Sequence, residues 1–267
     1  MCLIIFAYQA NPDLPLVVAA NRDEFFARPT RTAQFWTGDG MEGDLLAGKD
    51  LQAGGTWLGI TRSGRFAAVT NIRDPSQTER KPRSRGELTV DFLLGNRTAA
   101  DYAEELKHSY SEYAGYNLLL SDGCEFYYVN NFQSLSQKLS PGIYGLSNGL
   151  LNNNWPKVVR GQQGLKKLLD GEPDLKPEQL IALMANREQA ADSELPDTGL
   201  PQELERRLSS AFITDDNRGY GTLCSTAIIQ DKAGYIRFSE QNYAATGAAT
   251  KNCYFNFTRT AEAAEKV

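Results

Sequence analysis

The apolar, strand-like segments of this chain come in adjacent pairs, and the helix-like segments come in separate blocks. Turn-forming residues join three of these pairs: residues 56–62 with 65–72 across Ser63-Gly64, residues 116–121 with 125–130 across Asp122-Gly123, and residues 223–230 with 235–240 across residues 231–234. Parallel strands need a long crossover, usually a helix, between one strand and the next. The paired order therefore predicts an α+β fold of mostly antiparallel sheets covered by helices.

Further segments complete this plan. Residues 2–9 and 15–22 are expected to form neighbouring strands around the turn-forming sequence NPDLP, and residues 252–258 a last strand. Helical patterns occupy residues 87–95, the segment around His108, and residues 156–170, 177–185 and 201–212. Ser84 and Glu87 suggest a capping box for the first helix. The glycine-rich residues 36–57 are expected to form a loop over a cleft. No linker divides the chain, so we expect one domain over residues 1–267.

Charge and composition exclude several functional classes. Hydrophobic residues make up 41% of the 267 residues, which is typical of a globular protein, and the formal net charge of -5 argues against a nucleic-acid surface. No apolar run approaches the roughly 18 residues of a membrane span, and the basic segment of a secretory signal is missing. We therefore expect a cytoplasmic protein without a nucleic-acid partner or a membrane span.

The cysteines and the single histidine limit the possible chemistry. The four cysteines are too widely spaced for a zinc site and too few for a disulfide scaffold, so no metal and no resident cofactor is expected. The only histidine, His108, lies in a segment with helical spacing and is expected to be partly exposed. A Ser-His-Asp triad or a Cys-His dyad would have to use this residue. Catalysis is therefore expected to work without imidazole.

Cys2 directly follows the initiator methionine and begins the first apolar segment. Methionine aminopeptidase removes Met1 when the second residue is small, and the product would carry a thiol and a free α-amino group on one residue. An α-amine has an ordinary pKa of about 7.7–8.0, so it can accept the thiol proton near neutral pH. Cys2 would then supply both nucleophile and base. The alternative is a buried strand cysteine, a common position for a free thiol.

Polar residues follow several of the predicted strands. Arg22 and Asp23, in AANRDEF, could orient a thiolate or bind a carboxylate, although a regular strand would point them to opposite faces. Asn71 and Asn148 follow apolar runs, and an amide can donate to an oxyanion, but turns use asparagine more often. Arg73 begins a basic loop, for which a solvated connection is the alternative to an anion site.

A series of short motifs occurs in order between Cys2 and about Phe257: ANRDEF, GGTWLGI, VTN, RGEL, YNLLL, YGLSNGLLNNNW followed by Pro156-Lys157, and YGT. As a set they resemble the NRDE family, which is the family of the transport and Golgi organisation 2 proteins. This family is grouped with the N-terminal nucleophile hydrolases, and the resemblance implies a four-layer α-β-β-α sandwich. The family is linked to secretory-pathway organisation, to lipid and acyl-coenzyme A metabolism, and to haem trafficking.

A fainter similarity reaches the cholylglycine hydrolase branch of the same superfamily, which also begins Met-Cys. This resemblance implies catalytic roles for four residues: Cys2 as nucleophile, Asp23 as the aspartate near the end of the second strand, and Asn71 and Asn148 as oxyanion donors. The branch has an arginine three residues before its aspartate, where this chain has Ala20. Its later catalytic arginine has only Arg218 nearby.

Two functions follow from these residues and the resemblance. The first is an N-terminal-cysteine hydrolase that cleaves a small amide or acyl thioester through an acyl-enzyme at Cys2. Its substrate-binding residues would be Asn21, Arg22, Trp57 and Arg73. The alternative is a non-catalytic carrier that uses the same cleft to move haem or a lipid-like ligand, with haem held weakly through sulfur or tyrosine and arginines on its carboxylates. A scaffold that binds another protein has no motif in its support.

Overall fold

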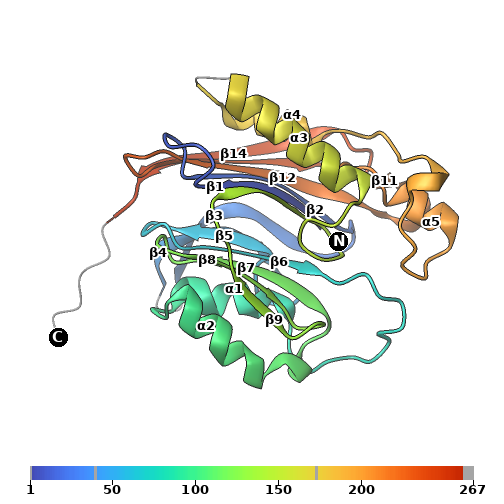
Figure 1. Ribbon diagram of the computed structural model, residues 1–267, viewed down its shortest axis with the longest axis horizontal. Coiled ribbons are helices and arrows are strands. Elements are labelled where there is room, and N and C mark those ends of the chain that lie inside the picture. Colours follow the sequence, from blue (N-terminus) through green and yellow to red (C-terminus); the bar gives the residue numbers. More distant parts are fainter. Residues whose placement is uncertain (1, 39–40, 172–173, 261–267) are drawn as a thin grey trace.

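Two antiparallel sheets form the body of the computed structural model, which describes residues 2–38, 41–171 and 174–260 (Figure 1). The first sheet has the order β10 (Gly142–Leu146), β1 (Cys2–Tyr8), β2 (Leu16–Phe25), β12 (Tyr220–Gln230), β13 (Tyr235–Tyr243) and β14 (Ala249–Thr258), with β11 (Thr214–Asp215) also paired to β12. The second has the order β3 (Thr30–Gly38), β4 (Met41–Asp50), β5 (Leu58–Thr61), β6 (Phe66–Asn71), β7 (Tyr116–Ser121), β8 (Phe126–Asn130) and β9 (Leu135–Lys138). Neighbouring strands are antiparallel in both sheets, as the paired order of the segments predicted.

Helices cover the outer face of each sheet. On the second sheet lie α1 (Arg85–Leu94) and α2 (Ala99–Glu105), and on the first lie α3 (Pro156–Gly171) and α4 (Pro177–Met184); α5 (Gln202–Arg207) lies near the end of β12 (Figure 1). The expected four-layer α-β-β-α sandwich is confirmed. Within the described ranges, no helix combines the length and the apolar character that crossing a membrane requires.

The alternation of side chains along β1 determines which face of the strand Cys2 occupies. Ile4 and Phe6 belong to the apolar core between the two sheets, whereas Leu3 and Ile5 belong to the core under α3 and α4. A third apolar layer joins the second sheet to α1 and α2. Because successive side chains of a strand point to opposite faces, Cys2 lies on the face of β1 that is turned toward the second sheet.

The prediction of a loop over residues 36–57 is wrong, because β3 and β4 run through most of this segment. Residues 39–40 lie outside the described residues. Leu45 is fully buried in the core, and a Cβ at Gly48 would lie 2.2 Å from the ring of Trp57. Glycine here allows close packing on a strand whose register shifts against β3, so the glycine content of the segment is misleading.

Two finer predictions also differ from the structure. Ser84 precedes α1, but its side chain makes no capping bond, and Glu87 pairs with an arginine instead, so the capping box does not form. The helix expected over 201–212 stops after six residues. Just beyond its end, the hydroxyl of Ser209 donates to the carbonyl of Arg206 at 2.6 Å. Such local serine bonds compete with helix continuation.

Candidate active site

Cys2 is fixed at the start of β1. It pairs with Arg22 of β2, and its backbone carbonyl accepts a hydrogen bond from Ser147 Oγ at 3.0 Å. The residue is half-buried and its thiol is free. Contacts from β2 on one side and from the segment after β10 on the other therefore hold the backbone of Cys2. Met1 lies outside the described residues, so its removal stays a prediction.

The surroundings of Cys2 raise the pKa of its thiol above the ordinary value. Burial is the main cause, and the carboxylate of Asp23 adds to it, since both disfavour a thiolate. The charge of Arg22 and the backbone N–H of Asp23 act in the opposite direction. A thiol with a raised pKa needs a nearby base to act as a nucleophile at neutral pH.

Arg22 reaches from the first sheet to the second. Its guanidinium donates to Thr30 Oγ1 at 2.7 Å, and it lies 3.8 Å from Asp50 Oδ2 and 4.1 Å from the centre of the Trp57 ring. Only 5% of the side chain is exposed. The polar and cation–π contacts together fix a positive charge close to Cys2.

Asp23 is buried, and β12 holds it in place. Thr222 Oγ1 donates to Asp23 Oδ1 at 2.7 Å, and the hydroxyl of Tyr220 donates to the backbone carbonyl of Asp23 at 2.9 Å. The register of β12 shifts between Thr222 and Cys224, opposite this part of β2. Both Arg22 and Asp23 belong to the wall of one cavity, although Arg22 contacts Thr30 of the second sheet and the Asp23 carboxylate contacts Thr222 of the first.

A cavity of about 120 Å³ opens beside Cys2. Its walls come from both sheets and from the start of α1: Cys2, Arg22, Asp23, Glu24, Arg28, Asp50, Thr56, Trp57, Val69, Asn71, Ser84, Arg85 and Gly86. The structure thus brings Cys2, Arg22, Asp23, Trp57 and Asn71, all predicted site residues, around one space.

The arginines of this cavity are not all neutralised by carboxylates. Arg28 donates to Asp50 at 2.7 Å, and Arg22 faces the same carboxylate. Arg85 donates to the carbonyl of Gly115 at 3.2 Å, and among the residues that the structure describes it has no carboxylate within 4.0 Å. Burial lowers the pKa of Arg85, and the charge of Arg28 acts in the same direction. An anionic ligand would relieve this unpaired positive charge.

Asn71 and Asn148 lie next to each other but have different surroundings. Asn148 is buried, its Nδ2 donates to the backbone carbonyl of Asn71 at 2.9 Å, and its own carbonyl accepts the N–H of Arg73 at 2.7 Å. Asn71 is half-buried on the cavity wall, and its side-chain amide has no hydrogen-bond partner within the described part of the chain. Asn71 can therefore donate to a ligand, while Asn148 fixes the end of β6.

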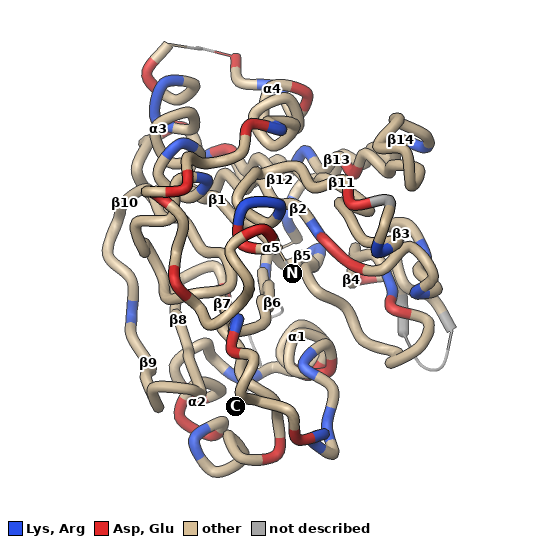
Figure 2. The backbone as a smooth tube through the Cα atoms, turned by 90° about the vertical axis from the view of Figure 1, so that its right-hand side faces the viewer, with Lys and Arg blue, Asp and Glu red and all other residues tan. Residues whose placement is uncertain are grey.

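Asn21 and Arg73, two of the predicted substrate-binding residues, do not line this cavity. The side-chain amide of Asn21 donates to the carbonyls of Met184 and Ala211 at 2.9 and 2.8 Å, so it holds α4 on the first sheet. Arg73 is buried against Glu205 of α5. Figure 2 looks onto this end of the molecule and shows charged positions of α5 and β2 near the amino end of the chain.

The sequence did not single out several residues around Cys2. Lys157 and Tyr220 lie inside motifs that carried the family resemblance, and this was the only signal available for them. Asp50 fell in the segment that was taken for a loop, and Arg28 had no signal at all. The contacts that bring these side chains together join different strands and helices, which no local pattern shows.

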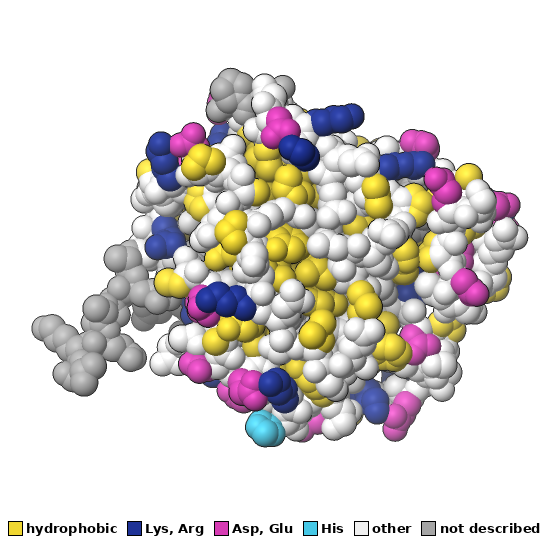
Figure 3. All heavy atoms as spheres, in the orientation of Figure 1, with side chains coloured by type: hydrophobic (Ala, Val, Ile, Leu, Met, Phe, Trp, Pro, Cys, Tyr) yellow, Lys and Arg dark blue, Asp and Glu magenta, His cyan; other side chains and the backbone are white. Residues whose placement is uncertain are grey.

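Three residues discussed for catalysis lie elsewhere. His108 is exposed just after α2, and its side chain stands at the surface in Figure 3. Arg218 is exposed and lines a different pocket, near α5. Ala20 packs in the core between the sheets. Among the described residues, no group of three or more His, Cys, Asp or Glu side chains could hold a metal ion.

Comparison with known proteins identifies relatives over nearly the whole chain. The model of the family "Transport and Golgi organisation 2" matches residues 1–245. The chain is 34% identical over 264 residues to the Transport and Golgi organization protein 2 homolog of Bos taurus and 33% identical over 260 residues to that of Homo sapiens, covering 91% of this chain and 93% of each relative. A solved variant of conjugated bile acid hydrolase from Clostridium perfringens has a TM-score of 0.50 and 8% identity, covering 97% of this chain and 98% of its own. The last likeness concerns the fold alone.

Proposed function

The chain belongs to the Transport and Golgi organisation 2 family, and from the residues around Cys2 we propose that it is a hydrolase that cleaves a small amide or acyl thioester. The observation that carries the proposal is the position of Cys2, a free thiol at the start of β1 on the wall of a cavity that also holds Asp23 and Asn71. A reducing compartment such as the cytoplasm would keep this thiol available.

The proposed reaction requires Met1 to be removed first. The thiol of Cys2 gives its proton to the new α-amino group and attacks the substrate carbonyl, so that a carbon–sulfur bond forms. The bond to the leaving nitrogen or sulfur then breaks, and the leaving group takes the proton from the ammonium. Water, deprotonated by the same amine, hydrolyses the acyl-enzyme and restores the thiol.

Asp23 is suited to hold the α-amino group. The pairing of β1 with β2 ends at Cys2 and Arg22, and Asp23 is the next residue of β2, beyond the amino end of β1. A carboxylate at this position can accept hydrogen bonds from an ammonium or amine on Cys2. The side-chain amide of Asn71 would donate to the oxyanion that forms when the thiol attacks.

A carrier of haem or of a lipid-like ligand is the second candidate. The arginines of the cavity favour it, because guanidinium groups suit the carboxylates of haem or the acidic end of a fatty acid. The volume of about 120 Å³ disfavours it, because pockets that enclose a drug-sized ligand usually measure about 300–1,000 Å³. A haem would have to bind across the mouth of the cavity and not inside it.

Parallel assays separate the two functions. Small amides and acyl thioesters are screened for turnover, and haem uptake and release are followed separately, with wild type, Cys2→Ala and Cys124→Ala. Cys124 is an exposed free thiol, which makes it a matched control. We expect turnover by wild type and Cys124→Ala and none by Cys2→Ala. If no substrate is turned over while haem moves equally well with all three proteins, the hydrolase proposal is wrong.

A further inference from the structure

A second group of buried charges lies behind Cys2. Arg73 follows β6, Lys157 lies in the first turn of α3, and Glu205 belongs to α5. All three side chains are at least nine-tenths buried. The carboxylate of Asp23 joins this group, since the charges of Lys157 and Arg73 both act on it. Two cations and two carboxylates are therefore buried close enough for their charges to act on one another.

Arg73 uses only one end of its guanidinium. Its Nη1 donates to Glu205 Oε2 at 2.5 Å, and the group lies 4.6 Å from the centre of the Trp155 ring. The other two nitrogens, Nε and Nη2, are buried and have no hydrogen-bond partner among the described residues. These two nitrogens form one edge of the planar group, with parallel N–H bonds at the spacing of the two oxygens of a carboxylate.

Lys157 also has unused hydrogen-bonding capacity. Its Nζ donates to the carbonyl of Leu208 at 2.9 Å, and an ammonium has three N–H bonds to offer. Burial lowers the pKa of Lys157 to about 8, and the charge of Arg73 is the next cause. Two cations thus act on each other in a place that water does not screen.

The carboxylate of Glu205 is already engaged. Both oxygens of Glu205 accept hydrogen bonds, one from Arg73 and the other from the backbone N–H and the hydroxyl of Thr198. Oδ1 of Asp23 accepts the hydroxyl of Thr222. Since buried N–H groups without an acceptor are rare and costly, the free edge of Arg73 indicates that an acceptor from outside the chain belongs there.

We infer that the free edge of Arg73 binds a carboxylate group of the molecule that reacts at Cys2, with Lys157 as the second buried cation of the group. That the bound molecule reacts at Cys2 rests on the proposed function. That a carboxylate binds at Arg73 does not. The substrate class it names is an amide or thioester that carries a carboxylate close to the bond that breaks. Bidentate contact in a water-free place would make the carboxylate a strong determinant of specificity.

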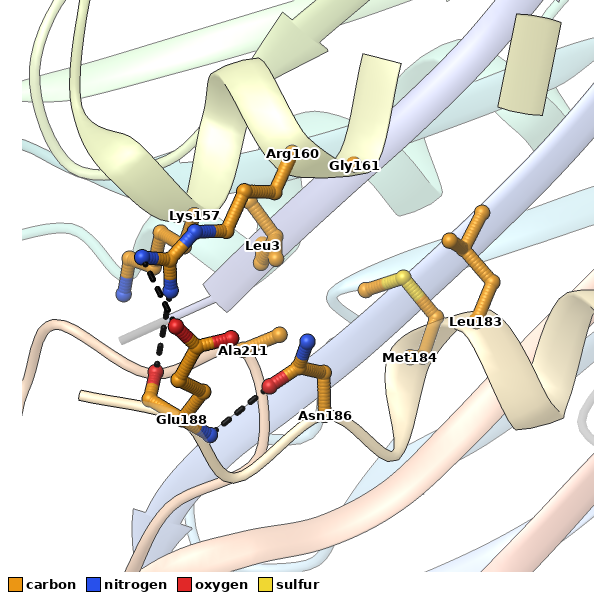
Figure 4. Close-up of a pocket in the computed structure, with 9 residues that line it drawn as sticks. All are labelled: Leu3, Lys157, Arg160, Gly161, Leu183, Met184, Asn186, Glu188 and Ala211. Atoms are coloured by element: carbon orange, nitrogen blue, oxygen red, sulfur yellow. Dashed lines mark hydrogen bonds and ion pairs between the residues drawn. The ribbon is translucent and has the colours of Figure 1, made fainter. Parts of the chain in front are cut away.

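The opposite side of Lys157 offers no route for such a molecule. A pocket of about 30 Å³ lies there between α3 and α4, with room for a water molecule or two, and Leu3, Gly161 and Met184 contribute apolar walls (Figure 4). Arg160 and Glu188 pair at 3.1 Å on its wall. This pocket is too small for a carboxylate-bearing substrate, and the inference places the approach on the side of Cys2.

Binding should depend on pH through Lys157. The groups that act on it are Arg73, Asp23, Cys2 and Glu205. A bound carboxylate favours the charged ammonium, so binding and protonation of Lys157 support each other. We expect carboxylate affinity to be constant between about pH 6 and 7, where the probe is fully ionised, and to fall as the pH rises through about 8.

The test uses acetate as the probe and acetamide as its neutral counterpart, with full-length wild type and Cys2→Ala. NMR spectra of the arginine Nε–H groups and calorimetry measure binding. We expect acetate, but not acetamide, to shift the Arg73 signal. Affinity should fall at least tenfold in Arg73→Lys, which keeps the charge but loses the two-pronged edge. Arg97→Lys, at an arginine that pairs with Glu105 near the surface, should bind like wild type.

Several results would overturn the inference. One is an equal effect of acetate and acetamide, and another is unchanged acetate binding in Arg73→Lys. The third is loss of acetate binding in Arg85→Lys alone, which would locate the carboxylate in the Cys2 cavity. If Arg73→Lys does not fold, the inference is tested on wild type alone, by whether acetate but not acetamide shifts the Arg73 signal. Acetate binding at Arg73 without turnover of any amide or thioester would leave the carboxylate site standing and remove the proposed function. Turnover without carboxylate binding would remove the site and leave the proposed function standing.

Discussion

Arg73 and Glu205 form a buried ion pair, with Nη1 and Oε2 2.5 Å apart, although the two residues are 132 positions apart in the chain. Arg73 follows β6 of the second sheet, whereas Glu205 belongs to α5, beside the end of β12 in the first sheet. The pair therefore ties the two halves of the sandwich together at the end of the molecule where Cys2 begins β1. Its strength should control both stability and the order of the site.

We predict that Glu205→Gln destabilises the protein by about 3–5 kcal/mol, because it leaves the guanidinium of Arg73 buried without a counter-charge. Glu203→Gln is the matched control on the same helix. Glu203 pairs with Arg207 at the surface, and such exposed pairs contribute little to stability. Urea unfolding of both variants measures the difference. Equal losses would show that burial of the Arg73 pair does not matter.

Substitution of Lys157 is predicted to stabilise the protein. Lowering its pKa from 10.5 to about 8 costs the folded state roughly 3 kcal/mol at neutral pH. Lys157→Met removes that cost but also the bond to Leu208, so we expect a net gain of about 1–3 kcal/mol at pH 7. Lys166→Met, at an exposed position of α3, should change stability little.

The pH dependence of the unfolding free energy tests whether the pKa of Lys157 is lowered. The unfolded chain keeps the lysine proton up to about pH 10.5, whereas the folded protein releases it near 8. Unfolding therefore takes up a proton between these values, and wild-type stability gains a contribution that grows as the pH rises from 8 to 10.5. We expect the difference between wild type and Lys157→Met to shrink over this range. A constant difference would contradict a lowered pKa.

Local signals were enough for much of the fold. The turns at Ser63-Gly64 and Asp122-Gly123 predicted their hairpins, because φ is positive at both glycines and turn geometry needs only neighbouring residues. The failure at residues 36–57 has a distant cause, since Gly48 is a strand residue that makes room for Trp57. Strand β9 is short and half-exposed, and no alternating pattern announced it.

The site divides in the same way. Cys2 could be predicted because its chemistry follows from its place in the chain. Arg73 was predicted as a substrate-binding residue, but its burial against Glu205 and the position of Lys157 could not be predicted, since these contacts join residues far apart in the sequence. The irregular pairing beside Asp23 arises on β12 and not on β2 itself. Strand alternation within AANRDEF separated its two central charges, but it could not show that both residues belong to the wall of one cavity.

Removal of Met1 is the premise of the proposed chemistry. We expect the intact mass of protein purified without an N-terminal tag to be lower by one methionine. A small second residue permits this processing, and only the processed chain has an α-amine on Cys2 to act as base. A fully retained Met1 would end this mechanism, although it would leave the fold unaffected.

Asp23→Asn should have two opposite effects. Burial first and the Asp23 carboxylate next raise the pKa of the Cys2 thiol, so removing the negative charge should lower that pKa and speed alkylation of Cys2 by iodoacetamide at pH 7.5. Turnover should fall, because the amide no longer attracts the α-ammonium. Mass spectrometry of the modified peptide follows alkylation, with Cys124 as an internal control. A parallel fall of both rates would indicate a distorted site.

The two asparagines should differ in what their loss affects. Asn71 faces the cavity with an unpartnered amide, so we expect Asn71→Ala to lower kcat by about 10²–10³, as for other oxyanion donors, with little change in stability.

Asn148→Ala leaves the carbonyl of Asn71 without its donor, and it should cost about 1–3 kcal/mol in unfolding free energy. Its effect on rate should follow from a displaced Asn71, so that the double variant is no slower than Asn71→Ala alone. If the two rate losses multiply in the double variant, both amides donate to the oxyanion independently. Unchanged turnover in Asn71→Ala would remove Asn71 from the reaction altogether.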